Sequence, residues 1–271
     1  MMDPVQLQQR LDTARAIARD AADRVRESPP GLVDAKHDAA DLVTEVDRAV
    51  ELQVRLALRE HFPDDAVAGE ELQDTSGTSG FTWLIDPIDG TTNFASGVPW
   101  CSVSIGGADR SGPLLGVVAD PWRREILSAA RGLGSWVDDR PVERPAHAEL
   151  AGGVVFTEWL NHVPWLGMTE TLAALAGDFA TVRIMGSSAL SLAATAVGRG
   201  CAFLNGSYSP VDTLGAIVIA RESGLVVRDF AGSDPQVGRP FYAAWPQVAP
   251  RITELTAAAD AAGATVDRKR G

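Results

Sequence analysis

The chain has 271 residues, of which 45% are hydrophobic and 22% are charged. This composition indicates a globular protein with a sizeable core and excludes a disordered chain. Asp and Glu (36) outnumber Lys and Arg (24), which gives a formal net charge of −12. Because so acidic a surface repels nucleic acid backbones and anionic membranes, we expect neither as a partner. A phosphate-bearing substrate would need a local device, such as a metal ion, to reverse the field where it binds.

The two cysteines, Cys101 and Cys201, are too few for a disulfide scaffold and have no CxxC spacing. We interpret them as buried thiols of a reduced, cytoplasmic protein. The histidines form no pair at zinc-ligand spacing; they are His37, His61, His147 and His162. Charged residues interrupt the first part of the chain, which excludes an apolar signal core, and no stretch reaches the ~20 apolar residues of a spanning helix.

The first half of the chain predicts two helices followed by an antiparallel sheet. Apolar residues recur at three- and four-residue steps over residues 5–26 and 45–60, as in amphipathic helices. Short strand patterns follow, separated by Gly, Pro and Asp clusters. They cover residues 66–68, 81–85, 102–105, 114–119, 125–129 and 135–137. We therefore expect an antiparallel sheet packed against a helical layer.

From about residue 150 the pattern alternates between strands and helices, which is typical of α/β layering. The expected strands are residues 154–156, 181–184, 201–204 and 225–228. The expected helices are residues 168–175, 188–197, 211–222 and 251–262. We find no repeat and no flexible linker. The prediction is a single domain over residues 1–271, with subdomains of roughly 1–150 and 151–271.

One stretch of the first half ends a predicted strand in two acids, Asp86 and Asp89. An extended chain would separate them by roughly 10 Å, so they can share a metal ion only if the chain turns between them. Pro87 cannot donate to a strand ladder and predicts that the strand ends there. The following residues 90–92 predict a helix start that Asp89 would cap, with free amides that suit a phosphate. Turn and cap roles alone would also explain both aspartates.

Three further acids could join this pair. Glu70 follows a short strand pattern, and a solvated loop also explains it. Asp212 begins the helix over residues 211–222, and Asp47 begins the helix over residues 45–60. A purely structural role also explains both, because acidic side chains at a helix N-terminus interact favourably with the helix dipole. Two carboxylates at ~4 Å repel by about 4 kcal/mol at an effective dielectric constant of ~20. Acids gathered at strand ends are therefore either solvated or neutralised by a hard cation such as Mg²⁺.

In combination, these segments resemble the inositol monophosphatase family of Mg²⁺-dependent, lithium-sensitive phosphomonoesterases. The matching segments are residues 41–47, 69–71, 83–94, 186–189 and 211–224. Their Asp-Pro-Ile-Asp-Gly-Thr motif together with Gly-Glu-Glu is highly specific, and the likeness spans most of the chain. The resemblance implies an α/β fold layered as an α-β-α-β-α sandwich, two or three Mg²⁺ ions and a homodimer.

Carried over residue by residue, the resemblance implies a metal site. Glu70, Asp86 and the backbone carbonyl of Ile88 would hold a first Mg²⁺. Asp86, Asp89 and Asp212 would hold a second, and a third, weaker ion could lie near Glu70. Such a pair of ions ~3.5–4 Å apart can clamp an in-line displacement.

The resemblance also implies the groups that handle water and phosphate. Thr91 with Asp47, or a metal with Glu70, would orient and deprotonate the attacking water. The amides of Gly90 and Thr91 would bind the phosphate.

The substrate pocket is implied in the same way. Gly186, Ser187 and Ser188 would line it, and Asp89 and Asp212 would also contact the substrate. Asn205 stands where inositol phosphatases usually place a glutamate that grips a sugar hydroxyl. An asparagine can still form that hydrogen bond, but without charge. This departure puts the inositol preference in doubt.

The resulting expectation is Mg²⁺-dependent hydrolysis of a small phosphorylated metabolite, with inositol monophosphate as the first candidate. One alternative is the same chemistry on histidinol phosphate, fructose bisphosphate or a 3′-phosphonucleotide. A second alternative is a catalytically silent scaffold protein that retains a metal site.

Overall fold

The structure is a computed structural model that describes residues 2–31, 33–35, 42–146, 148–160 and 163–270. Asp41, His37, His147 and His162 therefore lie outside the described residues. The helices are α1 (Pro4–Glu27), α2 (Glu45–His61), α3 (Thr91–Ala95), α4 (Met168–Gly177), α5 (Ser188–Ala196), α6 (Pro210–Ser223) and α7 (Ala249–Arg270). The strands are β1 (Val33–Ala35), β2 (Leu42–Thr44), β3 (Ala66–Gly69), β4 (Phe81–Asp89), β5 (Ser102–Asp109), β6 (Gly112–Asp120), β7 (Glu125–Ala130), β8 (Gly134–Val137), β9 (Arg140–Pro141), β10 (Val154–Thr157), β11 (Thr181–Ile184), β12 (Ala202–Asn205), β13 (Val226–Asp229) and β14 (Phe241–Ala244).

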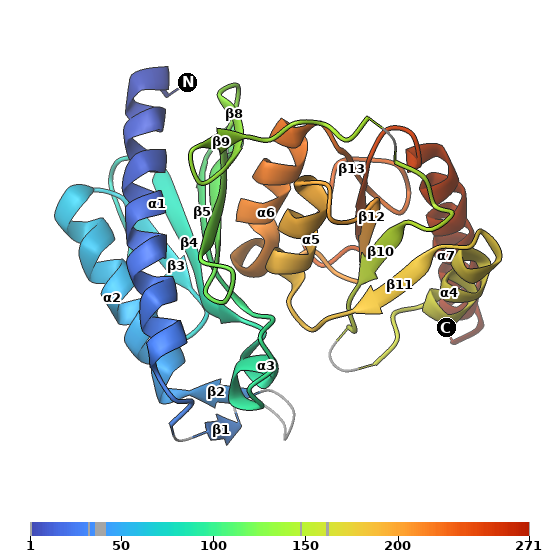
Figure 1. Cartoon of the computed structure of the whole chain (residues 1–271), viewed down its shortest axis with the longest axis horizontal. Coiled ribbons are helices and arrows are strands. Elements are labelled where there is room, and N and C mark those ends of the chain that lie inside the picture. Colours follow the sequence, from blue (N-terminus) through green and yellow to red (C-terminus); the bar gives the residue numbers. More distant parts are fainter. Residues whose placement is uncertain (1, 32, 36–41, 147, 161–162, 271) are drawn as a thin grey trace.

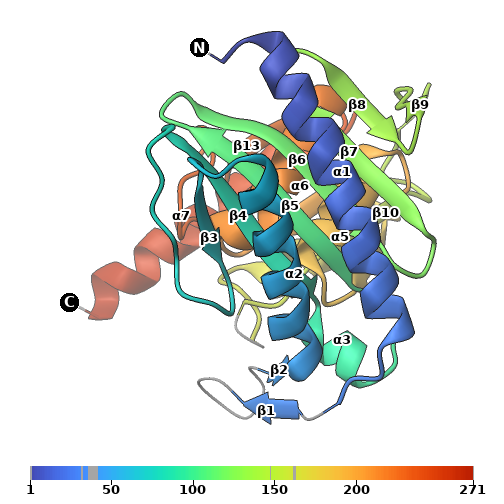
Figure 2. The same ribbon diagram turned by 90° about the vertical axis from the view of Figure 1, so that its left-hand side faces the viewer.

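These elements stack in five layers, α-β-α-β-α (Figure 1). Helices α1 and α2 cover the outer face of a seven-stranded sheet, as Figure 2 shows from the side. Helices α5 and α6 lie between that sheet and a five-stranded sheet, whose far face is covered by α4 and α7. The predicted layered α/β sandwich is thereby confirmed. Within the described residues, no helix has the length and apolar character needed to cross a membrane.

The outer helices follow from their caps and apolar stripes. Asp3 accepts a hydrogen bond from the first turn of α1, and Pro4 occupies a position where a missing N–H costs nothing. In α2, Thr44 and Asp47 form a reciprocal capping box. The apolar residues of both helices that face the sheet are buried; they are Leu7, Leu11, Ala14, Ala18, Ala21, Val50, Val54 and Leu58.

The seven-stranded sheet has the order β3-β4-β5-β6-β7-β8-β9 and is antiparallel except for the parallel pair β3–β4. The prediction that Pro87 ends its strand is wrong, because β4 continues to Asp89. Pairing with β5 breaks after Asp86 and resumes at Asp89, with one extra residue on β4. Since Pro87 has no N–H to donate, the strand accommodates it as a bulge and then rejoins the ladder.

The five-stranded sheet has the order β11-β10-β12-β14-β13. β10 lies parallel to β11 and β12, whereas β14 pairs antiparallel with β12 and β13. The sequence analysis missed β14, whose four residues are all buried. A run this short, flanked by Pro240 and Trp245, carries no alternation that marks a strand. The two-stranded sheet β1–β2 was missed for the same reason.

Helix α6 occupies the middle layer, and most of its residues are buried on all sides. It approaches the seven-stranded sheet backbone to backbone, because a Cβ placed on Gly116 of β6 would overlap the carbonyl of Gly215. Gly106 of β5 is equally confined, since its Cβ would lie 2.9 Å from a methyl group of Leu214. Glycines on facing elements thus set the spacing between sheet and helix.

Candidate active site

The end of β4 carries the two aspartates of the sequence motif, and the bulge between them brings both to the same end of the strand. Asp86 is 3% exposed and Asp89 is 8% exposed. The Asp86 carboxylate accepts a hydrogen bond from the backbone N–H of Ile88 at 3.1 Å, which closes the turn around Pro87. Two buried acids thus stand side by side where the strand leaves the sheet.

Acids from three other segments surround Asp86. Burial raises the pKa of Asp86 well above its ordinary value, and the negative charges of Glu70, Asp89 and Asp212 raise it further. A side-chain hydrogen bond with Glu70 also raises the pKa of Asp86. The turn after β3, the end of β4 and the first turn of α6 therefore meet at one acidic point.

Within the described residues, no three acidic, histidine or cysteine side chains form a preassembled metal cage. Asp89 shows the reason, because its carboxylate is turned toward the start of α5. It accepts hydrogen bonds from the amides of Ser188 (3.1 Å) and Ala189 (2.8 Å) and from the hydroxyl of Ser187. Burial nevertheless raises the pKa of Asp89 to about 6, against the lowering effect of these bonds.

The prediction that Asp89 caps the helix beginning at residues 90–92 is therefore wrong. Gly90 itself is the N-cap of α3, in a left-handed conformation with φ of 99°, and no side chain caps that helix. A Cβ on Gly90 would lie 2.8 Å from the carbonyl of Gly186. The residue must be glycine for the expected phosphate-binding turn to touch the turn at Gly186.

Thr91 links the motif to helix α2. Its hydroxyl lies 3.1 Å from a carboxylate oxygen of Asp47 and 3.1 Å from the carbonyl oxygen of Ile88. Asp47 is fully buried, and burial raises its pKa despite hydrogen bonds from Thr44 and Thr91. The hydroxyl can donate to Asp47 while it accepts from a water molecule, so these residues form a short path for a proton.

The turn that carries Glu70 is fixed by a buried ion pair that the sequence analysis missed. Glu51 accepts hydrogen bonds from the amides of Glu71 (2.7 Å) and Leu72 (3.2 Å) and from Arg55 (2.7 Å). Arg55 in turn donates to the carbonyls of Leu72 (3.0 Å) and Gln73 (3.1 Å). The Glu–Arg spacing of four residues in a predicted helix was the available signal.

The turn at Gly186 is also held by residues that the sequence analysis missed. Glu158, 4% exposed, accepts hydrogen bonds from the amide of Gly186 (2.6 Å) and the hydroxyl of Ser191 (2.7 Å). Burial raises the pKa of Glu158 to about 7. Asn93 donates to the carbonyl of Met185 (2.6 Å). Glu158 directly follows β10. An acid at the end of a predicted strand was the feature that identified Asp86 as a candidate site residue, and the same feature could have identified Glu158.

The remaining predicted substrate residues lie on the same side. Asn205 ends β12, is buried, and donates to the hydroxyl of Ser188 at 3.3 Å. Asp212 lies in the first turn of α6, whose N-cap is Ser209. The structure thus brings Asn205 to the Gly186–Ser188 turn and Asp212 close enough to Asp86 to raise its pKa.

Comparisons with known proteins show which family the chain belongs to. The family model described as "Inositol monophosphatase family" matches residues 6–261. The Nus factor SuhB of Pseudomonas aeruginosa is 35% identical over 238 residues, which cover 84% of this chain and 88% of that protein. Inositol monophosphatase 1 of Solanum lycopersicum is 34% identical over 237 residues, which cover 83% of this chain and 87% of that protein.

Two solved structures have the same fold as this chain. The IMPase of Thermotoga maritima superposes with a TM-score of 0.83 at 26% identity, over 93% of this chain and 98% of that one. The SuhB of Mycobacterium tuberculosis superposes with a TM-score of 0.75 at 31% identity, over 92% of this chain and 95% of that one. The chain belongs to the inositol monophosphatase family, a family of phosphomonoester hydrolases.

Proposed function

We propose that this chain hydrolyses a small phosphomonoester in a Mg²⁺-dependent reaction, with inositol monophosphate as the first substrate to test. The observation that carries the proposal is the convergence of Glu70, Asp89 and Asp212 on the buried Asp86. Acids held this close in a buried place oppose folding unless something neutralises them. A divalent cation would do so and would also attract a phosphate into an otherwise acidic protein.

The donor set fits Mg²⁺, because it consists of carboxylates and one backbone carbonyl. Glu70, Asp86 and the Ile88 carbonyl would hold one ion; Asp86, Asp89 and Asp212 would hold another, and a third could lie near Glu70. Bound Mg²⁺ supplies a water of lowered pKa and neutralises the charge on the phosphoryl oxygens.

The chain's own groups then orient the reactants. Thr91 holds the attacking water through its hydroxyl, and Asp47 receives the proton through that hydroxyl. The amides of Gly90 and Thr91 bind the phosphate. Ser188 and Asn205, already joined by a hydrogen bond, contact the hydroxyl-bearing part of the substrate.

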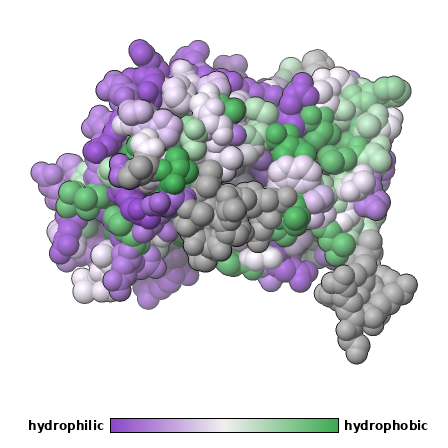
Figure 3. Space-filling model, turned by 90° about the horizontal axis from the view of Figure 1, so that it is seen from below, coloured by the Kyte–Doolittle hydropathy of each residue, from purple (hydrophilic) through white to green (hydrophobic). Residues whose placement is uncertain are grey.

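The proposal extends to a cytoplasmic homodimer that binds no nucleic acid. Exposed large hydrophobic side chains support the dimer, and five of them belong to the C-terminal half: Trp159, Val163, Leu166, Phe179 and Val237. On the face shown in Figure 3, hydrophobic side chains gather over that half and hydrophilic ones over the N-terminal half. Light scattering of the purified protein should give twice the mass of one chain.

Some relatives are named Nus factor SuhB. Their name favours a second candidate function, in which the chain acts as a Nus factor and this role does not depend on phosphate release. The substrate alternatives also stay open, because Asn205 is uncharged. Both are tested by giving the purified protein inositol 1-phosphate, histidinol phosphate, fructose bisphosphate and a 3′-phosphonucleotide, with and without Mg²⁺, and measuring free phosphate. We expect the fastest release from inositol 1-phosphate, only with Mg²⁺, and inhibition by lithium.

A different preferred compound would redirect the proposal to that substrate. If no free phosphate is released from any of the four compounds, the enzymatic proposal is contradicted and the scaffold or Nus-factor role is left. The Asp86→Asn variant is the control for a contaminating phosphatase, because release that persists in it does not come from this site.

A further inference from the structure

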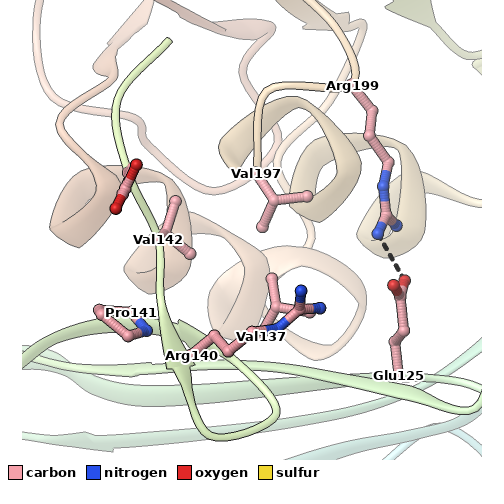
Figure 4. A pocket seen from close by; sticks show the side chains of 8 residues that line it. Glu125, Val137, Arg140, Pro141, Val142, Val197 and Arg199 are labelled. Carbon is pink, nitrogen blue, oxygen red and sulfur yellow. Dashed lines mark hydrogen bonds and ion pairs between the residues drawn. The ribbon is translucent and has the colours of Figure 1, made fainter.

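We propose that a second cavity, which shares no lining residue with the candidate active site, binds a small aliphatic carboxylate. The cavity has a volume of about 520 Å³ and lies between the C-terminal end of α5 and the strands β7–β9 (Figure 4). Its lining residues are Glu125, Val137, Arg140, Pro141, Val142, Glu143, Val197 and Arg199. A volume of this size accommodates a small organic molecule.

Arg199 presents hydrogen-bond donors that the protein does not use. Its Nη2 donates to Glu125 at 2.5 Å, which neutralises that glutamate. Its Nη1 is buried and has no hydrogen-bond partner among the described residues. Such an unpaired buried donor is rare in native proteins and indicates a missing acceptor.

Helix α5 does not account for this arginine. Three of the last four carbonyls of α5 accept from backbone amides, since Val197, Gly198 and Arg199 donate to Ala193, Thr195 and Ala194. The guanidinium group is therefore not needed to cap the helix.

Arg140 brings a second cation to the same cavity. Figure 4 shows it extending from β9 under Val197, while Arg199 descends from the opposite side toward Glu125. Its side chain makes no hydrogen bond or ion pair with the part of the chain that the structure describes. Two guanidinium groups that face one space, each with free donors, suit an acceptor with two oxygens, such as a carboxylate.

The net charge of the lining residues and the apolar side chains among them indicate the class of ligand. Glu125 is paired with Arg199, and Glu143 lies exposed among the lining residues, so the lining residues carry no net charge. A carboxylate with a single negative charge is therefore favoured over a phosphomonoester with two. Val137, Val142 and Val197 are half-buried and supply an apolar wall for a short branched chain.

Isothermal titration of the full-length protein with isovalerate tests this assignment. We expect saturable binding in the millimolar range, about tenfold weaker in Arg140→Gln, because one charge-assisted hydrogen-bonding group is lost. Arg110→Gln is the matched control, since Arg110 is also exposed, makes no side-chain hydrogen bond or ion pair with the described residues, and lies outside the cavity. It should bind isovalerate as the wild type does.

Two further probes complete the design. Isoamyl alcohol has a similar apolar body without the charge and should not bind, and inorganic phosphate should bind more weakly than isovalerate. Absence of saturation by isovalerate, equal affinity in Arg140→Gln, or tighter binding of phosphate would overturn the proposal. A cavity filled only by water would give the first of these results.

Discussion

Asp86 is the residue on which the other acids converge, and its replacement separates chemistry from stability. Asp86→Asn keeps the shape of the side chain but removes a charge from a buried acidic cluster. We expect turnover to fall by about 100-fold or more, because the variant loses a proposed metal ligand. Without metal, the melting temperature should stay equal or rise. Full activity in this variant would remove Asp86 from the mechanism.

The proposed role of Thr91 depends on its hydroxyl group and not on the shape of its side chain. Thr91→Val is nearly isosteric but loses the hydroxyl that can donate to either Asp47 or the Ile88 carbonyl. We expect kcat to fall by about 10²–10³-fold, as for other single catalytic donors, with an unchanged fold by circular dichroism. Thr91→Ser retains the hydroxyl and is the matched control. If valine and serine variants turn over equally fast, the hydroxyl has no such role.

Glu158 predicts a pH dependence of stability in the metal-free protein. Burial raises its pKa from 4.5 to about 7, so between these values the folded state holds a proton that the unfolded state has lost. The stability from this group is complete below about pH 4.5 and is lost as the pH rises to about 7, a loss of about 3 kcal/mol. Glu158→Gln should remove this component.

Denaturant unfolding at a series of pH values measures the effect. The free energy of unfolding should fall less steeply with pH in Glu158→Gln than in the wild type. Glu149→Gln changes an exposed glutamate and serves as the control, with the slope of the wild type. Parallel curves for the wild type and Glu158→Gln would contradict the prediction.

At the scale of elements, the turn after β3 depends on helix α2. Arg55→Lys keeps a positive charge beside Glu51 but cannot reach the carbonyls of Leu72 and Gln73 together. We expect a stability loss of about 1–3 kcal/mol and a higher Mg²⁺ concentration for half-maximal activity, because Glu70 is held less firmly. The value of kcat at saturating Mg²⁺ should change little.

Two measurements check this prediction, thermal unfolding and activity across a Mg²⁺ titration. Arg59→Lys, on the same helix and exposed, should leave both unchanged. An unaltered Mg²⁺ requirement in a destabilised Arg55→Lys would assign the ion pair to folding alone.

The sequence predicted elements well where periodicity is long and poorly where short elements lie in the interior. Helix α1 and the antiparallel strands from β4 to β8 follow from apolar spacing, whereas β14 is too short and too uniformly apolar to show a period. At the site, the acids were found because they belong to a dense motif. Glu51, Arg55 and Glu158 were missed because the backbone groups that they hold lie far away in the sequence, even though the Glu51–Arg55 pair itself is local.

At the scale of the whole molecule, the seven-stranded sheet and α6 touch through Gly116 and Gly215. Gly116→Ala would place a methyl group on the Gly215 carbonyl and push the helix away from the sheet. We expect a loss of stability of about 1–3 kcal/mol or more and a matching loss of activity, because α6 carries Asp212. Gly177→Ala is the control, since no atom of the part of the chain that the structure describes lies within 4 Å of its added Cβ, and α4 would gain helix propensity.

Chemical denaturation and a phosphate-release assay on both variants measure the two losses. An active, fully stable Gly116→Ala would show that the helix can shift without consequence.

We propose that the chain forms a single domain. A hydrophobic core cluster spans its proposed N- and C-terminal halves, since Leu127 of β7 and Phe203 of β12 belong to the same cluster. Unfolding should accordingly follow one cooperative transition.

The glycine contact between β6 and α6 also bears on how this protein tolerates change over evolutionary time. Asp86 stands on a strand of that sheet and Asp212 on that helix, so their separation is set by two main chains in direct contact. Changes of side-chain rotamer cannot alter this contact, because Gly116 and Gly215 have no side chains. The surrounding apolar positions are free to drift among residues of similar volume, while substitutions at Gly116 and Gly215 should be purged.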